Sequence, residues 1–224
     1  MTDLFLFVVF PYVVLALAVA MGVHRYVADR FSFSSLSSQF LENRALFWGS
    51  VPWHYGIVSI LGAHLLAALF PGSWGSLLGP PGRLYFLEVT GMALGLFTLV
   101  GLLLLIARRA GNARIRSVTT VMDGILLADL ALQVATGLYI AYSYRWGSLW
   151  YLHTAVPWLS SLARLQPVTA GIAPLPPVVR FHLFNAFIVV GLFPFTRLVH
   201  IFTVPIEYLW RPWQVVLWNR RPPP

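Results

Sequence analysis

The chain contains no cysteine and no lysine, and only 10% of its 224 residues are charged. Without cysteine it cannot form disulfides, thiolate zinc sites or iron–sulfur ligation, so a redox cofactor would need His, Met or Tyr ligands. A soluble domain of this length carries about a quarter charged residues. Because 58% of the residues are hydrophobic, we expect a membrane protein. The net charge of +8 comes from Arg alone and bears on membrane orientation, so nucleic-acid binding is not expected.

Five apolar runs are each long enough to cross a hydrocarbon core of about 30 Å as a helix. They are continuous and lack the period-2 alternation of barrel strands. The sequence therefore predicts an all-α integral membrane five-helix bundle, a single domain over residues 1–224 with a tail at 205–224. The expected helices lie at about residues 4–23, 51–70, 84–107, 122–142 and 181–204.

The placement of arginine predicts the orientation, since Arg accumulates in cytoplasmic connections. One side holds Arg25, Arg30, Arg44, Arg108, Arg109, Arg114, Arg116, Arg197, Arg211, Arg220 and Arg221. The other side holds Arg83, Arg145, Arg164 and Arg180. We therefore expect the N-terminus outside and the C-terminal tail inside. The first run has Asp3 before it and Arg after it, which favours an uncleaved helix over a signal peptide.

The connection at about 143–179 is the longest one. Its proline density excludes a sixth spanning helix. It is also rich in aromatic residues, which are typical of the membrane interface, so an interfacial flap on the outer surface is expected. These residues are Trp146, Trp150, Tyr151 and Trp158.

Four of the six histidines lie in two of the expected helices, His54 and His64 in the second and His182 and His200 in the fifth. Ionisable side chains in spanning helices are rare and usually functional, although interhelical hydrogen bonding is the alternative. The second and fifth helices run in opposite directions. His54 is therefore expected opposite His200 near the inner face, and His64 opposite His182 farther out.

Helix geometry refines this pairing. In straight helices His54 and His64 lie roughly 15 Å apart along the axis, and His182 and His200 roughly 27 Å apart. The unequal rises require a tilt or bend, and Pro194 predicts a kink. Two His without a nearby Cys or acidic group are too few for zinc, and copper would more naturally bring Met. Haem iron with one axial His from each helix fits, which predicts two stacked haems.

Several motifs together resemble the gamma subunit of respiratory nitrate reductase, a dihaem cytochrome b. They cover nearly the whole chain in order, and the string around His200 with Pro205 and Glu207 is the most specific. The motifs are Trp53-His54-Tyr55-Gly56-Ile57, Gly62-Ala63-His64, Arg180-Phe181-His182-Leu183, Phe193-Pro194-Phe195-Thr196-Arg197-Leu198-Val199-His200-Ile201, Val204-Pro205-Ile206-Glu207-Tyr208, Ser37-Ser38-Gln39 and Thr119-Thr120.

The resemblance implies a multi-pass subunit of a bacterial or archaeal cytoplasmic membrane. It would oxidise menaquinol or ubiquinol near the outer face, as part of a quinol:nitrate oxidoreductase complex. Electrons would pass through an outer and an inner haem b to an iron–sulfur beta subunit and a molybdenum-containing alpha subunit. The quinol pocket would lie beside His64, with Arg83 where known family members carry Lys. Glu88 would accept a quinol proton or pair with Arg83.

Other acidic residues and histidines have simpler expectations. Asp123 lies in the first turn of the fourth helix, where a carboxylate complements the helix dipole. Asp129 is deeper and must face the bundle interior or a polar partner. His24 and His153 have no facing partner and are expected at the interfaces.

Two other functions stay open from the sequence. One is the cytochrome b anchor of a sulfur-compound or heterodisulfide-type reductase. The other is a haem-free membrane transport or scaffold protein.

Overall fold

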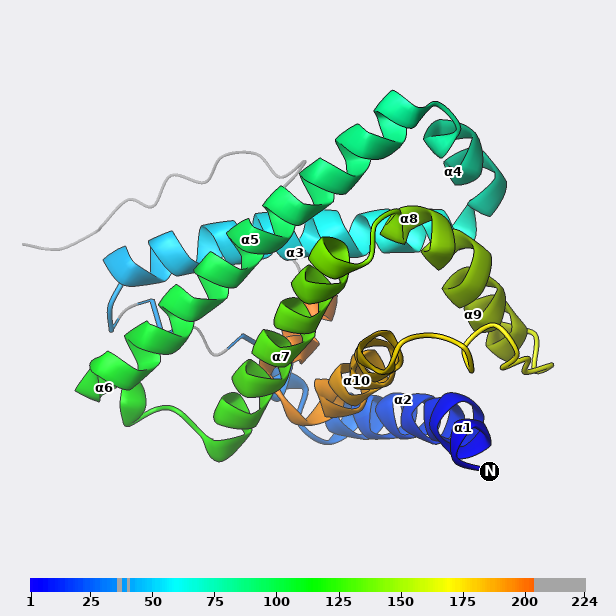
Figure 1. Ribbon diagram of the computed structural model, residues 1–224. Helices are drawn as coiled ribbons and strands as arrows, with labels where there is room; N and C mark the ends of the chain where they lie inside the picture. The colour runs from blue at the N-terminus through cyan, green and yellow to red at the C-terminus, as the bar shows by residue number, and fades with distance from the viewer. Residues whose placement is uncertain (36–37, 40, 204–224) are drawn as a thin grey trace, which may run out of the picture.

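The computed structural model describes residues 1–35, 38–39 and 41–203, and every regular element in them is helical (Figure 1). Five helices are long and apolar enough to cross a membrane, which confirms the predicted all-helical architecture. The first span comprises α1 (Thr2–Leu4), a π-helical turn (Phe5–Val9) and α2 (Phe10–Ala28). The others are α3 (Arg44–Leu69), α5 (Pro81–Gly111), α7 (Val121–Ser143), and α10 (Pro177–Leu192) with the 3-10 turn Phe193–Phe195.

Short helices occupy the connections between the spans. They are α4 (Pro71–Leu78), α6 (Ala113–Arg116), α8 (Gly147–Trp150) and α9 (Val156–Ala163). The expected C-terminal tail at 205–224 lies outside the described residues, as do the motif residues Ser37 and 204–208.

The spans pack in a definite order of neighbours. Helix α3 packs against α5, α5 against α7, α7 against α10, and α10 against α2. Figure 1 shows α5 crossing α3, with α10 and α2 side by side. The two helices that carry candidate histidines, α3 and α10, are therefore joined through α5 and α7.

Small residues bring α3 and α5 into very close contact. A Cβ added at Gly56 on α3 would lie 2.1 Å from Thr98 Oγ1, and one added at Gly101 on α5 would lie 2.5 Å from the backbone nitrogen of Trp53. Backbones in a membrane approach this closely only where glycine or another small residue faces the partner helix. The sequence of α3 around His54 is thus fixed to α5 by packing.

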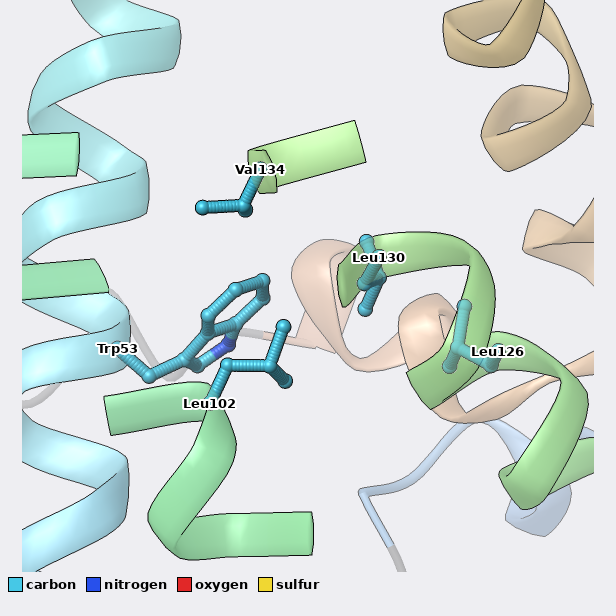
Figure 2. Close-up of a cluster of buried hydrophobic side chains, with 5 residues drawn as sticks. All are labelled: Trp53, Leu102, Leu126, Leu130 and Val134. Carbon is cyan, nitrogen blue, oxygen red and sulfur yellow. The ribbon is translucent and has the colours of Figure 1, made fainter. Parts of the chain in front are cut away.

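One buried apolar cluster ties α3, α5 and α7 together (Figure 2). Its central side chain is the indole of Trp53, which precedes His54 and is 9% exposed. Val189 of α10 and Leu198 beyond it also pack on this cluster. The core therefore lies next to the segments that carry His54 and His200. Its buried members are Trp53, Leu102, Leu126, Leu130 and Val134.

The fifth span differs from the continuous kinked helix predicted at 181–204. Helix α10 ends at Leu192, a 3-10 turn follows, Thr196 is extended, and a second 3-10 helix runs over Arg197–Thr203. Pro194 has no N–H, so it removes one intrahelical hydrogen bond and favours a break here. The carbonyls freed at the break accept hydrogen bonds from the guanidinium of Arg25, at 2.7 Å for Pro194 and 3.0 Å for Thr196. The 27 Å axial separation expected between the two histidines of this span therefore does not apply.

The long connection at 143–179, predicted as an interfacial flap, contains helices and is fastened to the first span. Residues 147–163 are helical, and Trp158, expected in an interfacial belt, is only 2% exposed. Its indole N–H donates to the carbonyl of Phe7 at 2.9 Å, which fastens α9 to the first span. Proline permits this structure because it falls in the first turn of α9 and of α10, where no intrahelical N–H donor is needed.

Candidate functional site

The structure brings the rings of His54 and His200 together. His54 projects from α3, and His200 projects from the 3-10 helix Arg197–Thr203. Their ring centres are 6.1 Å apart, and the ring planes are at 76° to each other. When two imidazoles bind the same metal ion, each through a nitrogen at about 2.0 Å, their ring centres lie roughly 6 Å apart. The separation therefore suits two axial ligands of a single metal ion.

Three of the four candidate ligands share one hydrogen-bonding arrangement. The Nδ1 atoms of His54, His64 and His200 lie 2.8, 2.8 and 2.6 Å from backbone carbonyl oxygens three or four residues earlier. A carbonyl only accepts, so Nδ1 carries the proton in each neutral ring and the lone pair is on Nε2. This is the tautomer in which an outer partner orients a metal-binding His. The carbonyls belong to Ser50, Ile60 and Arg197.

His182 is held by a different helix. Thr136 of α7 places its Oγ1 2.9 Å from the Nδ1 atom, and Gln133 of α7 places its amide nitrogen 3.3 Å from the Nε2 atom. The rings of His54 and His200 are in direct contact, and the pairing of His64 with His182 stays a prediction.

Tyr151 covers the His64 ring, a contact that sequence reasoning missed. The two ring centres are 5.0 Å apart in an edge-on arrangement, and the phenol donates to the backbone carbonyl of His64 at 3.2 Å. Burial raises the pKa of Tyr151, so the phenol remains protonated near neutral pH. The two residues are 87 positions apart with no spacing pattern, so only the tertiary fold reveals the contact.

The quinol-pocket candidates Glu88 and Arg83 are not paired with each other in the part of the chain that the structure describes. Glu88 instead accepts a hydrogen bond from the backbone N–H of Ser148 at 2.8 Å, which links α5 to the start of α8. Arg83 is exposed in the first turn of α5. Together, Glu88 and Tyr151 fasten the segment after residue 146 to α5 and α3.

Asp123 lies in the first turn of α7, as predicted, and it also forms an ion pair with Arg197. Its carboxylate accepts from the Nε and Nη2 atoms of Arg197 at 2.7 and 2.9 Å. It also completes a capping box with Thr120 at the start of α7, and Arg109 lies 3.5 Å away. Because Arg197 precedes His200 by three residues, this ion pair anchors the segment that presents His200.

Within the described residues, the other two histidines, His24 and His153, do not belong to a metal-binding cluster. His24 and His153 are exposed. Within residues 1–35, 38–39 and 41–203, no three His, Asp or Glu side chains are grouped so that they could hold a metal ion. Paired histidines therefore suit a metal that brings most of its own ligands, and a porphyrin brings four nitrogens.

Comparison with known proteins gives matches along nearly the whole chain. Residues 3–219 match the family model described as nitrate reductase gamma subunit. The chain is 30% identical to the nitrate reductase gamma chain of Bacillus subtilis (strain 168), over 92% of this chain and 94% of that protein. It is also 30% identical to the respiratory nitrate reductase 1 gamma chain of Escherichia coli (strain K12), over 96% of each.

A third relative has a different length. The chain is 33% identical to the nitrate reductase-like protein NarX of Mycobacterium tuberculosis (strain ATCC 25618 / H37Rv), over 95% of this chain. The match covers 33% of that protein, so the chain corresponds to one part of it.

Proposed function

The chain belongs to the nitrate reductase gamma subunit family, and from this we propose that it is the dihaem b membrane subunit of a quinol:nitrate oxidoreductase. In this role it oxidises quinol and passes electrons towards the soluble subunits of the complex. The observation that carries the proposal is the facing pair His54 and His200, with ring centres 6.1 Å apart.

The histidines fit the ligand set of two b-type haems. His54 and His200 would hold the inner haem, and His64 and His182 the outer one. Each haem supplies an iron that accepts and releases one electron, with four in-plane nitrogens from its porphyrin. The chain's contribution is to present Nε2 of each ring and to fix its orientation through the Nδ1 hydrogen bond.

The quinol would bind beside the outer pair. Within the described residues the Arg83 side chain forms no hydrogen bond or ion pair, so its guanidinium is available to a quinol oxygen. Glu88 and Tyr151 hold the segment after residue 146 against α5 and α3, beside His64. The carboxylate of Glu88, which accepts from the Ser148 N–H at 2.8 Å, is the candidate to take a quinol proton.

The distribution of Arg supports an outside N-terminus and an inside C-terminus. Asp3 and Arg180 form an ion pair, so the chain start and the beginning of α10 lie on one side, as alternating spans require in either orientation. Quinol oxidation at the outer pair would release protons outside while electrons travel to the inner pair. The partners on the inner side would be the iron–sulfur beta subunit and the molybdenum-containing alpha subunit.

Two measurements on the complex purified from its native membrane test this proposal. Optical spectra of the reduced protein should show b-type bands from two haems per chain, and mass spectrometry should identify co-purifying iron–sulfur and molybdenum subunits. Absence of haem would leave a transport or scaffold role. Haem together with a different soluble reductase would instead indicate the anchor of a sulfur-compound or heterodisulfide-type enzyme.

A further inference from the structure

His182 differs from the other three candidate ligands in what orients its ring. Their Nδ1 atoms contact a carbonyl of their own segment, whereas the Nδ1 of His182 contacts the side-chain oxygen of Thr136, 2.9 Å away on another helix. The orientation of this ring therefore depends on the packing of α7 against α10.

The number of available hydrogen atoms determines which partner donates in the hydrogen bond between Thr136 and His182. The hydroxyl has a single hydrogen, and its oxygen lies 2.8 Å from the carbonyl of Leu132 and 3.0 Å from that of Gln133. Both carbonyls are acceptors only, so the hydroxyl donates to one of them and accepts from the Nδ1–H of His182. The lone pair of His182 is then on Nε2, as in the other three rings.

Gln133, which lies on the same face of α7 as Thr136, is also oriented towards His182. Asn185, which is 1% exposed, donates to the Oε1 of Gln133 at 2.9 Å. The Gln133 amide nitrogen is thereby turned to His182, where it lies 3.3 Å from both Nε2 and the backbone carbonyl. If Nε2 held the haem iron, the His182 carbonyl would remain as the acceptor for this amide.

Glycine makes room for the ring on this face. A Cβ added at Gly137 would lie 3.1 Å from Cε1 of His182, closer than ordinary van der Waals contact. Gln133, Thr136 and Gly137 are three and four residues apart, so they lie on one face of α7. This face is shaped to receive the imidazole of His182.

We propose that Thr136 is a positioning residue for the outer haem, setting the tautomer and ring orientation of His182 through its hydroxyl. This inference rests on the proposed dihaem function. A hydrogen bond from Nδ1–H strengthens the imidazole as a donor to iron and stabilises the oxidised metal. Removal of the hydroxyl therefore shifts the outer haem to a higher reduction potential and leaves the inner haem unchanged.

The experiment compares Thr136→Val with Thr136→Ser in the assembled complex in membranes. A redox titration and the electron paramagnetic resonance signal of each haem are the readouts, with the outer haem assigned as the one lost in His182→Ala. The matched control is Thr98→Val, because the Thr98 hydroxyl also donates to a carbonyl one turn earlier, at 2.7 Å, in another helix pair. We expect a shift and an altered signal for the outer haem in Thr136→Val alone, with wild-type behaviour in Thr136→Ser.

Other results would overturn the inference. An unchanged outer haem in Thr136→Val, an equal effect in Thr98→Val, or a shift confined to the inner haem would each show that Thr136 does not position His182. If Thr136→Val does not assemble, Thr136→Ala is compared with Thr136→Ser by the same criterion. Wild-type protein without haem would instead refute the proposed function itself.

Discussion

Arg197 donates two hydrogen bonds to the carboxylate of Asp123, with nitrogen–oxygen distances of 2.7 and 2.9 Å. This ion pair joins the start of α7 to the 3-10 helix Arg197–Thr203. The side chain of Asp123 is only 5% exposed, so the ion pair is largely shielded from solvent. The backbone carbonyl of Arg197 also orients the ring of His200 at 2.6 Å. Arg197 therefore connects the start of α7 to His200.

Replacing Asp123 by Asn should destabilise this junction. Removing one partner of a buried ion pair costs about 3–5 kcal/mol, because the other charge is left without compensation. We expect a lower thermal unfolding midpoint and loss of the haem bound by His200, measured by optical spectroscopy of the heated complex. Thr120→Ala is the control, since it removes the cap, at a cost of about 1 kcal/mol, and leaves the ion pair. Equal haem retention in the two variants would contradict this role.

Gly56→Ala should separate α3 from α5. The added methyl group would lie 2.1 Å from Thr98 Oγ1 and 3.1 Å from the carbonyl oxygen of Leu94, so a helix must shift. Overpacking of this kind costs about 1–3 kcal/mol. Gly62→Ala on the same helix is the matched control, because nothing lies within 4 Å of its added Cβ. We expect reduced assembly, measured by the yield of haem-containing complex, for Gly56→Ala only, and equal yields would refute the close contact.

The ion pair of Glu42 and Arg108 should make stability depend on pH in acid. The Arg108 hydrogen bond, at 2.6 Å, and the backbone N–H of Ala45 lower the pKa of Glu42 below its ordinary value of 4.5. A group with a lowered pKa in the folded state stabilises fully above its unfolded pKa, and this contribution is lost as pH falls through the folded pKa.

Glu42→Gln should therefore lower the unfolding midpoint above pH 4.5 and converge with wild type in more acidic buffer. The measurement is the thermal unfolding of the purified complex across this range. Asp29→Asn is the control, because within the described residues its carboxylate accepts a hydrogen bond only from the turn N–H of Ser32, at 3.3 Å. A wild-type advantage that grows in acid would have the wrong sign for this ion pair.

Arg83→Ala should impair quinol oxidation while both haems remain bound, since the residue is proposed to hold quinol and not iron. Turnover should also respond to the membrane potential, because each charge moved against it costs about 2.3 kcal/mol per 100 mV. In vesicles of known orientation we expect proton release on the outer side and faster turnover when an uncoupler is added. Proton release on the cytoplasmic side would place quinol oxidation at the inner pair.

The sequence predicted the features of the fold that depend on local composition. The five spans follow from run length and hydropathy, and the structure has them. The alternating helix directions also placed His54 opposite His200, whose ring centres are 6.1 Å apart, and the pairing of His64 with His182 stays a prediction. Pattern analysis works here because the lipid requires each spanning helix to satisfy its own backbone.

The break at Pro194 could not be predicted in the same way. Whether proline kinks or ends a helix depends on what satisfies the freed carbonyls, and here the donor is Arg25, 169 residues away in sequence. The burial of Trp158 similarly depends on the carbonyl of Phe7, 151 residues away. Tyr151 at His64 and Thr136 at His182 are contacts of the same tertiary kind.

The most direct test of the central claim is an optical redox titration of four single variants, His54→Ala, His64→Ala, His182→Ala and His200→Ala. We predict that the His64 and His182 variants lack the same haem and retain the other, and that the His54 and His200 variants show the reverse. If the His64 and His200 variants lost the same haem, or if wild-type protein carried no haem, the nested dihaem arrangement would be wrong.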